Sequence, residues 1–210
     1  QLYREFKSFF PNNAAEYFVS YYDYYQPEAY VPARDLYIEK DCSINEEIDR
    51  LRLAATYSLM ERRDVIVVAT VSCIYGLGMP DLYKEMRVHI EKGSILDTQK
   101  FAEQLISLQY TRNDAILERG NFRIKGDVIE VFPPYMETDE AYRIELDWDE
   151  ITKIKRFHVI SGEIKENLDE TVFYPAKHFV VPHDVLLDAT KRIENELQER
   201  LTVLESQKKL

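Results

Sequence analysis

The sequence is poor in cysteine and has no long apolar run. Cys42 and Cys73 are the only cysteines among its 210 residues, and they lack CxxC spacing. Neither a disulfide framework nor a zinc site is therefore predicted; both are expected to be small buried residues, and a reducing cytoplasm fits this usage best. No apolar run approaches the roughly 20 residues of a membrane span, and no signal-peptide pattern follows Gln1, so we expect no membrane contact.

Motifs for nucleotide binding and catalysis are also absent. The sequence has no GxxxxGK[ST] loop, no GxSxG turn and no HExxH pair, and its 4 histidines are scattered. Gly76 and Gly78 follow an apolar run, but the third glycine of a dinucleotide-binding fingerprint would fall at Asp81. We therefore predict no catalytic residue, no metal site and no cofactor within these residues, and no enzyme activity from this chain alone.

Positive charge is scarce. Lysine and arginine number 27 against 38 aspartates and glutamates, which gives a formal net charge of −11. Non-specific affinity for nucleic acid comes mainly from cations that neutralise phosphates, so this balance argues against a general electrostatic DNA-binding protein. Any contact with DNA is expected to be local and to depend on stacking more than on charge.

Tyrosine, in contrast, is concentrated in the run VSYYDYYQPEAYVP, from Val19 to Pro32. Because Pro27 and Pro32 cannot donate to a sheet ladder, the run predicts an exposed, irregular hairpin over about residues 19–41. Flat phenol rings can serve as a platform for bases, worth roughly 1–3 kcal/mol per stacked base; a packing patch or a protein interface is an equal alternative. The clustered rings are Tyr21, Tyr22, Tyr24, Tyr25 and Tyr30.

The segments on either side of this hairpin predict an α/β unit. Ser43 and Glu46 form a capping-box pattern before an amphipathic helix. The stretch 64–72, DVIVVATVS, is apolar throughout, as in a strand buried on both faces of a parallel sheet. Residues 1–86 are therefore assigned to a partial α/β domain, and residues 176–210, with leucines at helical spacing, to a closing helix that returns to it.

Residues 87–175 predict a separate, antiparallel α+β unit inserted into that domain. Helix-like stretches at 82–90 and 98–108 precede alternating strands, with turn signals at 126–127 and 161–162. Polar residues share strand faces there, and such a face is either solvated or a docking surface for a protein, where arginine is favoured. Arg123 and Lys125 are predicted to share one strand face, as are Arg143 and Glu145. Arg112 stands beside a predicted turn.

The run EYFVSYYDYYQPEAYVP, followed by YIEKD, SINEEIDRLR and SCIYGLG, resembles the UvrB family. These are the helicase-like damage-verification subunits of bacterial nucleotide excision repair, and the resemblance covers essentially all 210 residues. It implies a mixed fold, α/β plus α+β: part of the first RecA-like helicase domain, which is a P-loop NTPase fold, carrying a β-hairpin and an inserted UvrA-binding domain. In that family the hairpin passes between the DNA strands beside a lesion.

The resemblance also implies roles for individual residues. Tyr37 stands where the family often has phenylalanine, and Lys125 where it often has arginine, which keeps the charge and loses bidentate pairing. Residues implied in DNA binding are Tyr21, Tyr22, Tyr24 and Tyr25 at the base of the hairpin, Tyr30 and Tyr37 further along it, and Glu28, Lys40 and Arg52. Residues implied in UvrA binding are Arg112, Arg123, Lys125, Arg143 and Glu145.

The implied partners are UvrA and damaged DNA, with UvrC as a partner of the full-length protein. The phosphate-binding loop, the DEAH box and the second RecA-like domain lie outside these residues, so ATP and magnesium are expected only in the longer protein. An alternative of another class is a protein-interaction module like that of the transcription-repair coupling factor, whose tyrosines pack against a further domain and never touch DNA.

Overall fold

The computed structural model describes residues 1–20, 22–39, 41–74, 80–181 and 183–207. At 22–25, 41–44, 72, 82, 183 and 184 it describes the backbone alone. The chain divides into two compact units, Gln1–His178 and Phe179–Leu210. The structure has a mixed α and β composition with several separate sheets, as expected for α/β plus α+β.

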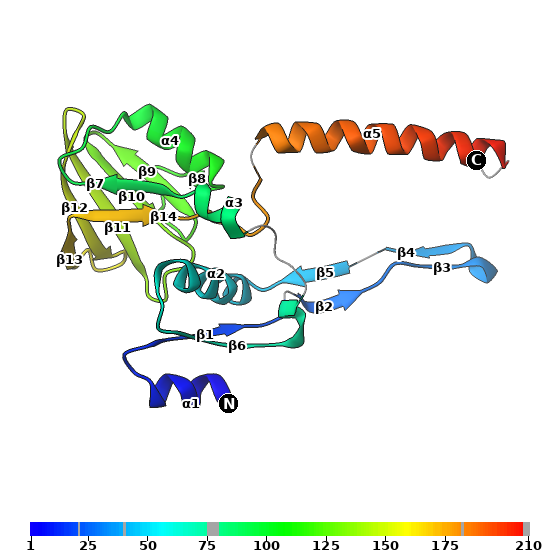
Figure 1. Cartoon of the computed structure of the whole chain (residues 1–210), viewed down its shortest axis with the longest axis horizontal. Helices are drawn as coiled ribbons and strands as arrows, with labels where there is room; N and C mark the ends of the chain where they lie inside the picture. The colour runs from blue at the N-terminus through cyan, green and yellow to red at the C-terminus, as the bar shows by residue number, and fades with distance from the viewer. Residues whose placement is uncertain (21, 40, 75–79, 182, 208–210) are drawn as a thin grey trace. The chain divides into compact units, whose positions relative to one another are not determined.

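The first sheet is a parallel pair formed by β1 (Ala14–Phe18) and β6 (Val65–Ala69), as the sequence predicts (Figure 1). Helix α1 (Leu2–Phe9) precedes it, and Pro11 follows that helix. The expectation that the apolar stretch is buried on both faces is wrong, because β6 is only half-buried and ends in an exposed residue. Within the described residues this sheet has only two strands, so few side chains cover it.

Helix α2 (Glu46–Glu61) is capped by Asn45, which corrects the predicted capping box. The Asn45 side-chain oxygen accepts hydrogen bonds from the backbone nitrogens of Glu47 at 2.9 Å and Ile48 at 3.3 Å. Ser43 lies instead in strand β5 (Asp41–Ile44), two positions too early to cap. Asparagine is as good a cap as serine, so it takes this role at the position where the chain turns into the helix.

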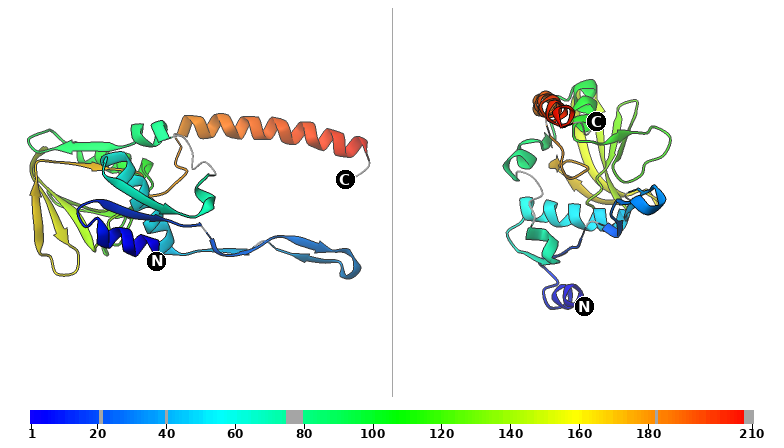
Figure 2. Two further views of the ribbon diagram at one scale, coloured as in Figure 1. Left: turned by 60° about the horizontal axis from the view of Figure 1, so that its bottom comes forward. Right: turned by 90° about the vertical axis from the view of Figure 1, so that its right-hand side faces the viewer.

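A two-stranded ribbon connects β1 to α2 in the form of two successive ladders (Figure 2). Strand β2 (Tyr22–Gln26) pairs with β5, and β3 (Ala29–Val31) pairs with β4 (Leu36–Ile38). Pro27 falls between the ladders, and Pro32 opens the short helix η1 (Pro32–Arg34) at the turn. The predicted irregular hairpin is therefore present. Both prolines lie outside the two ladders, as expected for a residue that has no backbone N–H to donate to a paired strand.

A six-stranded sheet dominates the second half of the first unit, and its strand order is β13-β12-β11-β10-β9-β8. All neighbours are antiparallel except β8 and β9, which are parallel. Turns at Gly126 and Gly162, both in the left-handed region, link neighbouring strands as predicted. The strands are β8 (Thr111–Arg112), β9 (Asn121–Lys125), β10 (Val128–Phe132), β11 (Glu140–Asp147), β12 (Glu150–His158) and β13 (Ile164–Leu168).

Only the first part of the stretch predicted as helical near residues 82–90 is a helix. Helix α3 (Pro80–Glu85) follows the short helix η2 (Val71–Ile74) and ends before β7 (Val88–Glu91), which pairs with β14 (Glu170–Phe173). Pairing with a strand some 80 residues later overrides local propensity here. Helix α4 (Thr98–Ser107) agrees with its prediction.

The core lies between this sheet, α4 and α2. Phe101, Phe122 and Phe173 are fully enclosed, and Tyr57 of α2 stacks on Tyr135 with ring centroids 4.4 Å apart. Each large apolar side chain buried in this way contributes roughly 1.5–3 kcal/mol. Cys73, expected to be buried, is exposed at the end of η2.

The second unit is built on helix α5 (His183–Ser206). The predicted leucine spacing is confirmed as helical, and several of these apolar side chains are exposed. No helix in the described part of the chain is both long and apolar enough to cross a membrane.

Candidate nucleic-acid and protein interfaces

The end of the hairpin presents two tyrosines side by side. Tyr30 of β3 is the direct cross-strand partner of Tyr37 of β4, so both rings stand on one face of the ribbon. Their exposed fractions are 56% and 59%, and no side chain in β3 or β4 is buried. The Tyr30 hydroxyl donates to Asp35 Oδ1 at 2.7 Å, which raises the pKa of that phenol.

Asp35 fixes the turn beside these rings. Its φ of 47° lies in the left-handed region, which aspartate tolerates better than most residues. The hydrogen bond from Tyr30 therefore joins one ring of the pair to the turn and restricts how far it can swing. An exposed aromatic pair on a defined β-ribbon is a geometry on which a base can stack.

The other predicted hairpin residues are described less completely. Tyr22, Tyr24 and Tyr25 lie in β2, where their backbones pair with Ile44, Ser43 and Cys42, with a register shift between Tyr22 and Tyr24. Their side chains, and all of Tyr21 and Lys40, lie outside the described residues. Glu28 is exposed between the two ladders.

Arg52, expected to contact DNA, is 4% exposed in this structure. Its guanidinium donates to the backbone carbonyl of Val19 and lies over the Phe18 ring, 4.1 Å from the centroid. Both residues stand where β1 leads into the hairpin, so Arg52 contacts the root of the hairpin from α2. A DNA contact by this side chain stays a prediction.

Four of the five predicted protein-binding residues share one face of the six-stranded sheet by strand register: Arg123, Lys125, Arg143 and Glu145. Glu130 of β10 is the cross-strand partner of both Arg123 in β9 and Arg143 in β11. Its carboxylate is 6% exposed and accepts from both guanidiniums, with Arg143 Nε to Oε1 at 2.7 Å. Arg143 also lies over the Phe157 ring, 4.4 Å from its centroid. One buried carboxylate thus holds both arginines on the sheet.

The next strand along extends this charged surface. Glu145 of β11 accepts a hydrogen bond from Lys155 and forms an ion pair with Lys153 at 3.4 Å, both in β12. The hydrogen bond from Lys155 is the main cause of the lowered pKa of Glu145. Sequence reasoning missed Glu130 and Lys155, although a single glutamate within the apolar run of β10 was a signal that a cation must lie beside it.

Arg112 and Lys125 complete the predicted set at the β8–β9 side of this sheet. Arg112 pairs with Asp114, with Nη2 to Oδ2 at 2.9 Å, and this contact holds the pKa of Asp114 low. Asp114 Oδ1 also accepts from the backbone nitrogen of Ile124, which ties the loop to β9. Lys125 is exposed at the end of β9. The five predicted residues therefore lie on three strands, β8, β9 and β11, of one sheet.

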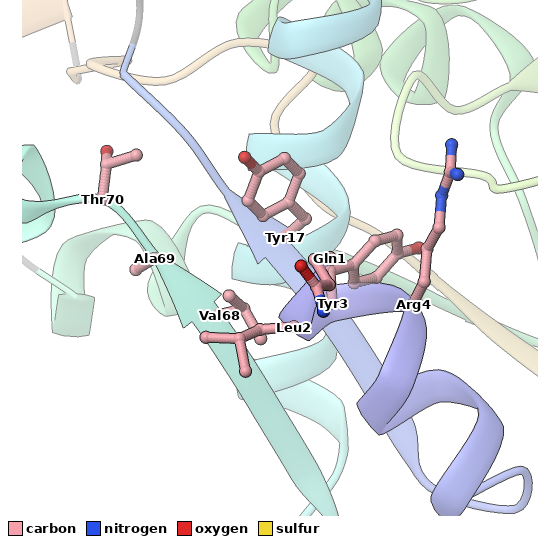
Figure 3. A pocket seen from close by; sticks show the side chains of 8 residues that line it. All are labelled: Gln1, Leu2, Tyr3, Arg4, Tyr17, Val68, Ala69 and Thr70. Atoms are coloured by element: carbon pink, nitrogen blue, oxygen red, sulfur yellow. The ribbon is translucent and has the colours of Figure 1, made fainter.

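A hollow of about 620 Å³ lies between α1 and the ends of β1 and β6 (Figure 3). Tyr3 and Tyr17 line it and stack with centroids 5.5 Å apart, and Arg4 is its only charged side chain. This lining offers no pair of acid and base. In the described residues no three histidine, cysteine, aspartate or glutamate side chains come together as a metal site would require.

Comparison with known proteins places these surfaces in a family. The sequence family described as "UvrB interaction domain" matches residues 88–179. The whole chain is 67% identical over 210 residues to UvrABC system protein B of Treponema denticola, 62% to that of Treponema pallidum and 55% over 211 residues to that of Pseudomonas fluorescens. The chain belongs to the UvrB family. It spans 31% of the length of these curated relatives.

The UvrB assignment covers both candidate surfaces, in different ways. The matched interaction domain begins at β7 and extends beyond β14, so it contains the whole six-stranded sheet with Arg123, Glu130 and Arg143. The tyrosine hairpin lies outside that match and inside the full-length similarity to UvrB relatives.

Proposed function

We propose that this chain carries two binding functions of bacterial UvrABC excision repair, probing of damaged DNA by the aromatic hairpin and binding of UvrA by the inserted sheet. Support comes from the family, from the exposed pair of Tyr30 and Tyr37, and from the arginines held by Glu130. The exposed tyrosine pair carries the DNA-probing part of the proposal. The coupling-factor-like alternative is not favoured, because relatives 67% and 62% identical over the whole of this chain, hairpin residues included, are named UvrABC system protein B.

The hairpin is suited to bind nucleotides by their faces. With a net charge of −11 the chain has few cations for phosphates, whereas two adjacent exposed phenols each offer a stacking surface worth roughly 1–3 kcal/mol per base. A ribbon of two strands is thin enough to pass between separated DNA strands. A base that carries a bulky adduct resists this passage, and the stalled complex would mark the lesion.

The sheet surface is suited to bind a protein. Arginine is enriched at interfaces because its planar fork pairs with carboxylates in fixed geometry. Glu130 holds Arg123 and Arg143 in place before a partner arrives, which lowers the entropy lost on binding. Glu145, with a lowered pKa, stays ionised and offers a negative group beside them.

The remaining functions belong to the longer protein. We assign to it the complete RecA-like P-loop fold, the binding of ATP and magnesium, helicase-like activity, the interaction with UvrC and a cytoplasmic location. The chain itself has no GxxxxGK[ST] loop, so no step that depends on ATP is derived for its residues.

UvrA binding is tested by reversing charge on the sheet. Arg123→Glu with Arg143→Glu should weaken capture by immobilised UvrA at least tenfold. The matched control is Lys100→Glu with Lys191→Glu, the same charge change on α4 and α5. Because the first pair also removes both partners of Glu130, Lys125→Glu provides a milder variant on the same surface. Undiminished binding by both sheet variants would exclude this surface.

DNA probing is tested on a bubble oligonucleotide by fluorescence anisotropy. Tyr30→Ala with Tyr37→Ala should weaken binding about tenfold or more, since two stacking faces are lost. Tyr30→Phe with Tyr37→Phe keeps both rings and should bind nearly as well as the unmodified chain. Equal binding by the alanine variant would favour a hairpin that contacts protein alone.

A further inference from the structure

The root of the hairpin is tied to the parallel sheet at two points. The Thr70 backbone nitrogen donates to the Phe18 carbonyl at 3.0 Å, and the hydroxyls of Ser20 and Thr70 lie 3.2 Å apart. These contacts fix where the first arm leaves β1. Both contacts come from Thr70, directly after β6, and contacts from other elements restrain the direction of the arm further.

Arg52 makes that further contact from helix α2. Its guanidinium donates to the Val19 carbonyl, between the two residues tied to Thr70, and covers the Phe18 ring at 4.1 Å. Burial of an arginine is costly unless its charge and donors are used. A planar group that donates in its plane and stacks on a ring constrains both the position and the rotation of the arm beneath it.

The same helix meets β1 a second time, further from the hairpin. The Ser58 hydroxyl donates to Glu16 Oε1 at 2.7 Å. Six helical residues from Arg52 to Ser58 rise about 9 Å, and three extended residues from Val19 to Glu16 span about 10 Å, so the two contacts are in register. Only the Arg52 contact reaches the hairpin, which makes Ser58 a natural control.

Arg52 is also close to the segment that leaves the inserted unit. Thr56 Oγ1 donates to the Arg52 carbonyl at 3.0 Å and lies 3.1 Å from His178 Nε2. His178 is buried, and the positive charge of Arg52 contributes to lowering its pKa. One turn of α2 thus contacts the hairpin root through Arg52 and the end of the inserted unit through Thr56.

We propose that Arg52 is a positioning residue for DNA probing: it sets the direction of the hairpin through Val19 and Phe18, and links it through Thr56 and His178 to the UvrA-binding unit. This inference rests on the proposed function. It gives Arg52 a role at the hairpin root, in place of the direct DNA contact that the family resemblance implies.

The test compares Arg52→Met, Arg52→Lys and Ser58→Ala in the chain. Binding of a single-stranded oligonucleotide is measured by anisotropy over a range of salt concentrations, and amide hydrogen exchange is measured in β2 and β5. Arg52→Met should weaken binding about tenfold with an unchanged salt slope, and exchange in both strands should be faster. Arg52→Lys retains a donor for the Val19 carbonyl, so its oligonucleotide affinity and its exchange rates in β2 and β5 should lie between those of Arg52→Met and the unmodified chain. Ser58→Ala should lower stability without weakening oligonucleotide binding and without faster exchange in β2 and β5.

Two results would overturn the proposal. A salt slope that falls by about 0.7 in Arg52→Met would show a lost phosphate contact and hence a direct role. Hairpin exchange that is no faster in Arg52→Met than in Ser58→Ala would show that Arg52 does not hold the root. If the unmodified chain binds no oligonucleotide, the proposed DNA function fails, and the exchange data still decide whether Arg52 positions the hairpin.

Discussion

The buried carboxylate on the sheet makes a quantitative prediction about stability. The Glu130 side chain is 6% exposed, and those of Arg123 and Arg143 are 23% and 29% exposed. Breaking a fully buried ion pair costs about 3–5 kcal/mol, whereas exposed pairs contribute about 0–1 kcal/mol. Since the arginines retain some contact with water, Glu130→Gln should lower the free energy of unfolding by about 2–3 kcal/mol.

A double-mutant cycle separates the ion pair from the other contacts of each side chain. Arg143→Met should cost about 2 kcal/mol, because it also removes the guanidinium from the Phe157 ring, a contact worth about 0.5–1 kcal/mol. The variant with both Glu130→Gln and Arg143→Met should be less destabilised, by about 1–2 kcal/mol, than the sum of the two single variants. In the double variant neither the Glu130 charge nor the Arg143 charge remains without the other. Arg123 still pairs with Glu130 in Arg143→Met, which keeps the coupling below the value for an isolated pair.

Urea unfolding followed by circular dichroism measures all four proteins, and equal m-values would validate the comparison. A coupling below about 0.5 kcal/mol would refute the reasoning, because the three charges would then behave as an ordinary exposed network. The matched control is the cycle of Lys165 with Glu163, an exposed pair at 2.7 Å, for which coupling near zero is expected.

Three further predictions concern pH and backbone conformation. Burial, followed by the nearby positive charge of Arg52, lowers the pKa of His178 from 6.5 to about 4. Neutral His178 therefore contributes fully to the free energy of unfolding above pH 6.5, and this contribution is lost as the pH falls toward 4. Between these pH values the free energy of unfolding should change by up to about 3 kcal/mol, and His178→Gln should remove this dependence. Burial raises the pKa of Tyr57 and Tyr135 above the ordinary value of 10.0, so stability should fall as pH rises beyond 10, with phenolate absorbance and unfolding appearing together; phenol ionisation without unfolding would contradict this. Trp148, 90% exposed with φ 55°, occupies a turn position that favours glycine, so Trp148→Gly should raise the melting temperature through about 1 kcal/mol of relieved strain, whereas Asp149→Gly should lower it.

Local patterns predict well the elements whose contacts are close in sequence. The apolar spacing of α4 and the turns at Gly126 and Gly162 depend on a few neighbouring residues, and all three agree with the structure. The predicted helical ending at 88–90 is wrong, because these residues belong to β7, whose strand partner β14 lies about 80 residues away, and no local signal reveals it. The start of α2 shows the same limit at shorter range, since the sequence pattern predicted Ser43 as the cap, whereas Ser43 pairs in β5 and Asn45 caps the helix.

The candidate surfaces show where residue types alone stop being informative. Family resemblance named Arg123 and Arg143; the sequence signalled only that Glu130 needs a cation, and the register of three strands shows that these two arginines are its partners. Arg52 was grouped with DNA-contacting residues by family resemblance, and its burial beside Phe18 depends on the packing of α2 against β1. Tyr30 and Tyr37 could be named from sequence; that they are direct partners required the pairing of β3 with β4.

The returning arm of the hairpin enters α2 with no intervening linker, because β5 ends at Ile44 and Asn45 already caps the helix. A pull on the ribbon therefore acts along the first turn of α2, where two hydrogen bonds to one side chain resist it before any other bond is strained. Under tension the helix should unwind from this end, one turn at a time. Arg52, with its contacts to Val19 and Phe18, lies nearly two turns further along the helix. The hydrogen bonds to Asn45 are thus expected to break first under force on the ribbon. If a DNA strand resisted passage of the hairpin, the resulting force would act on this helix cap.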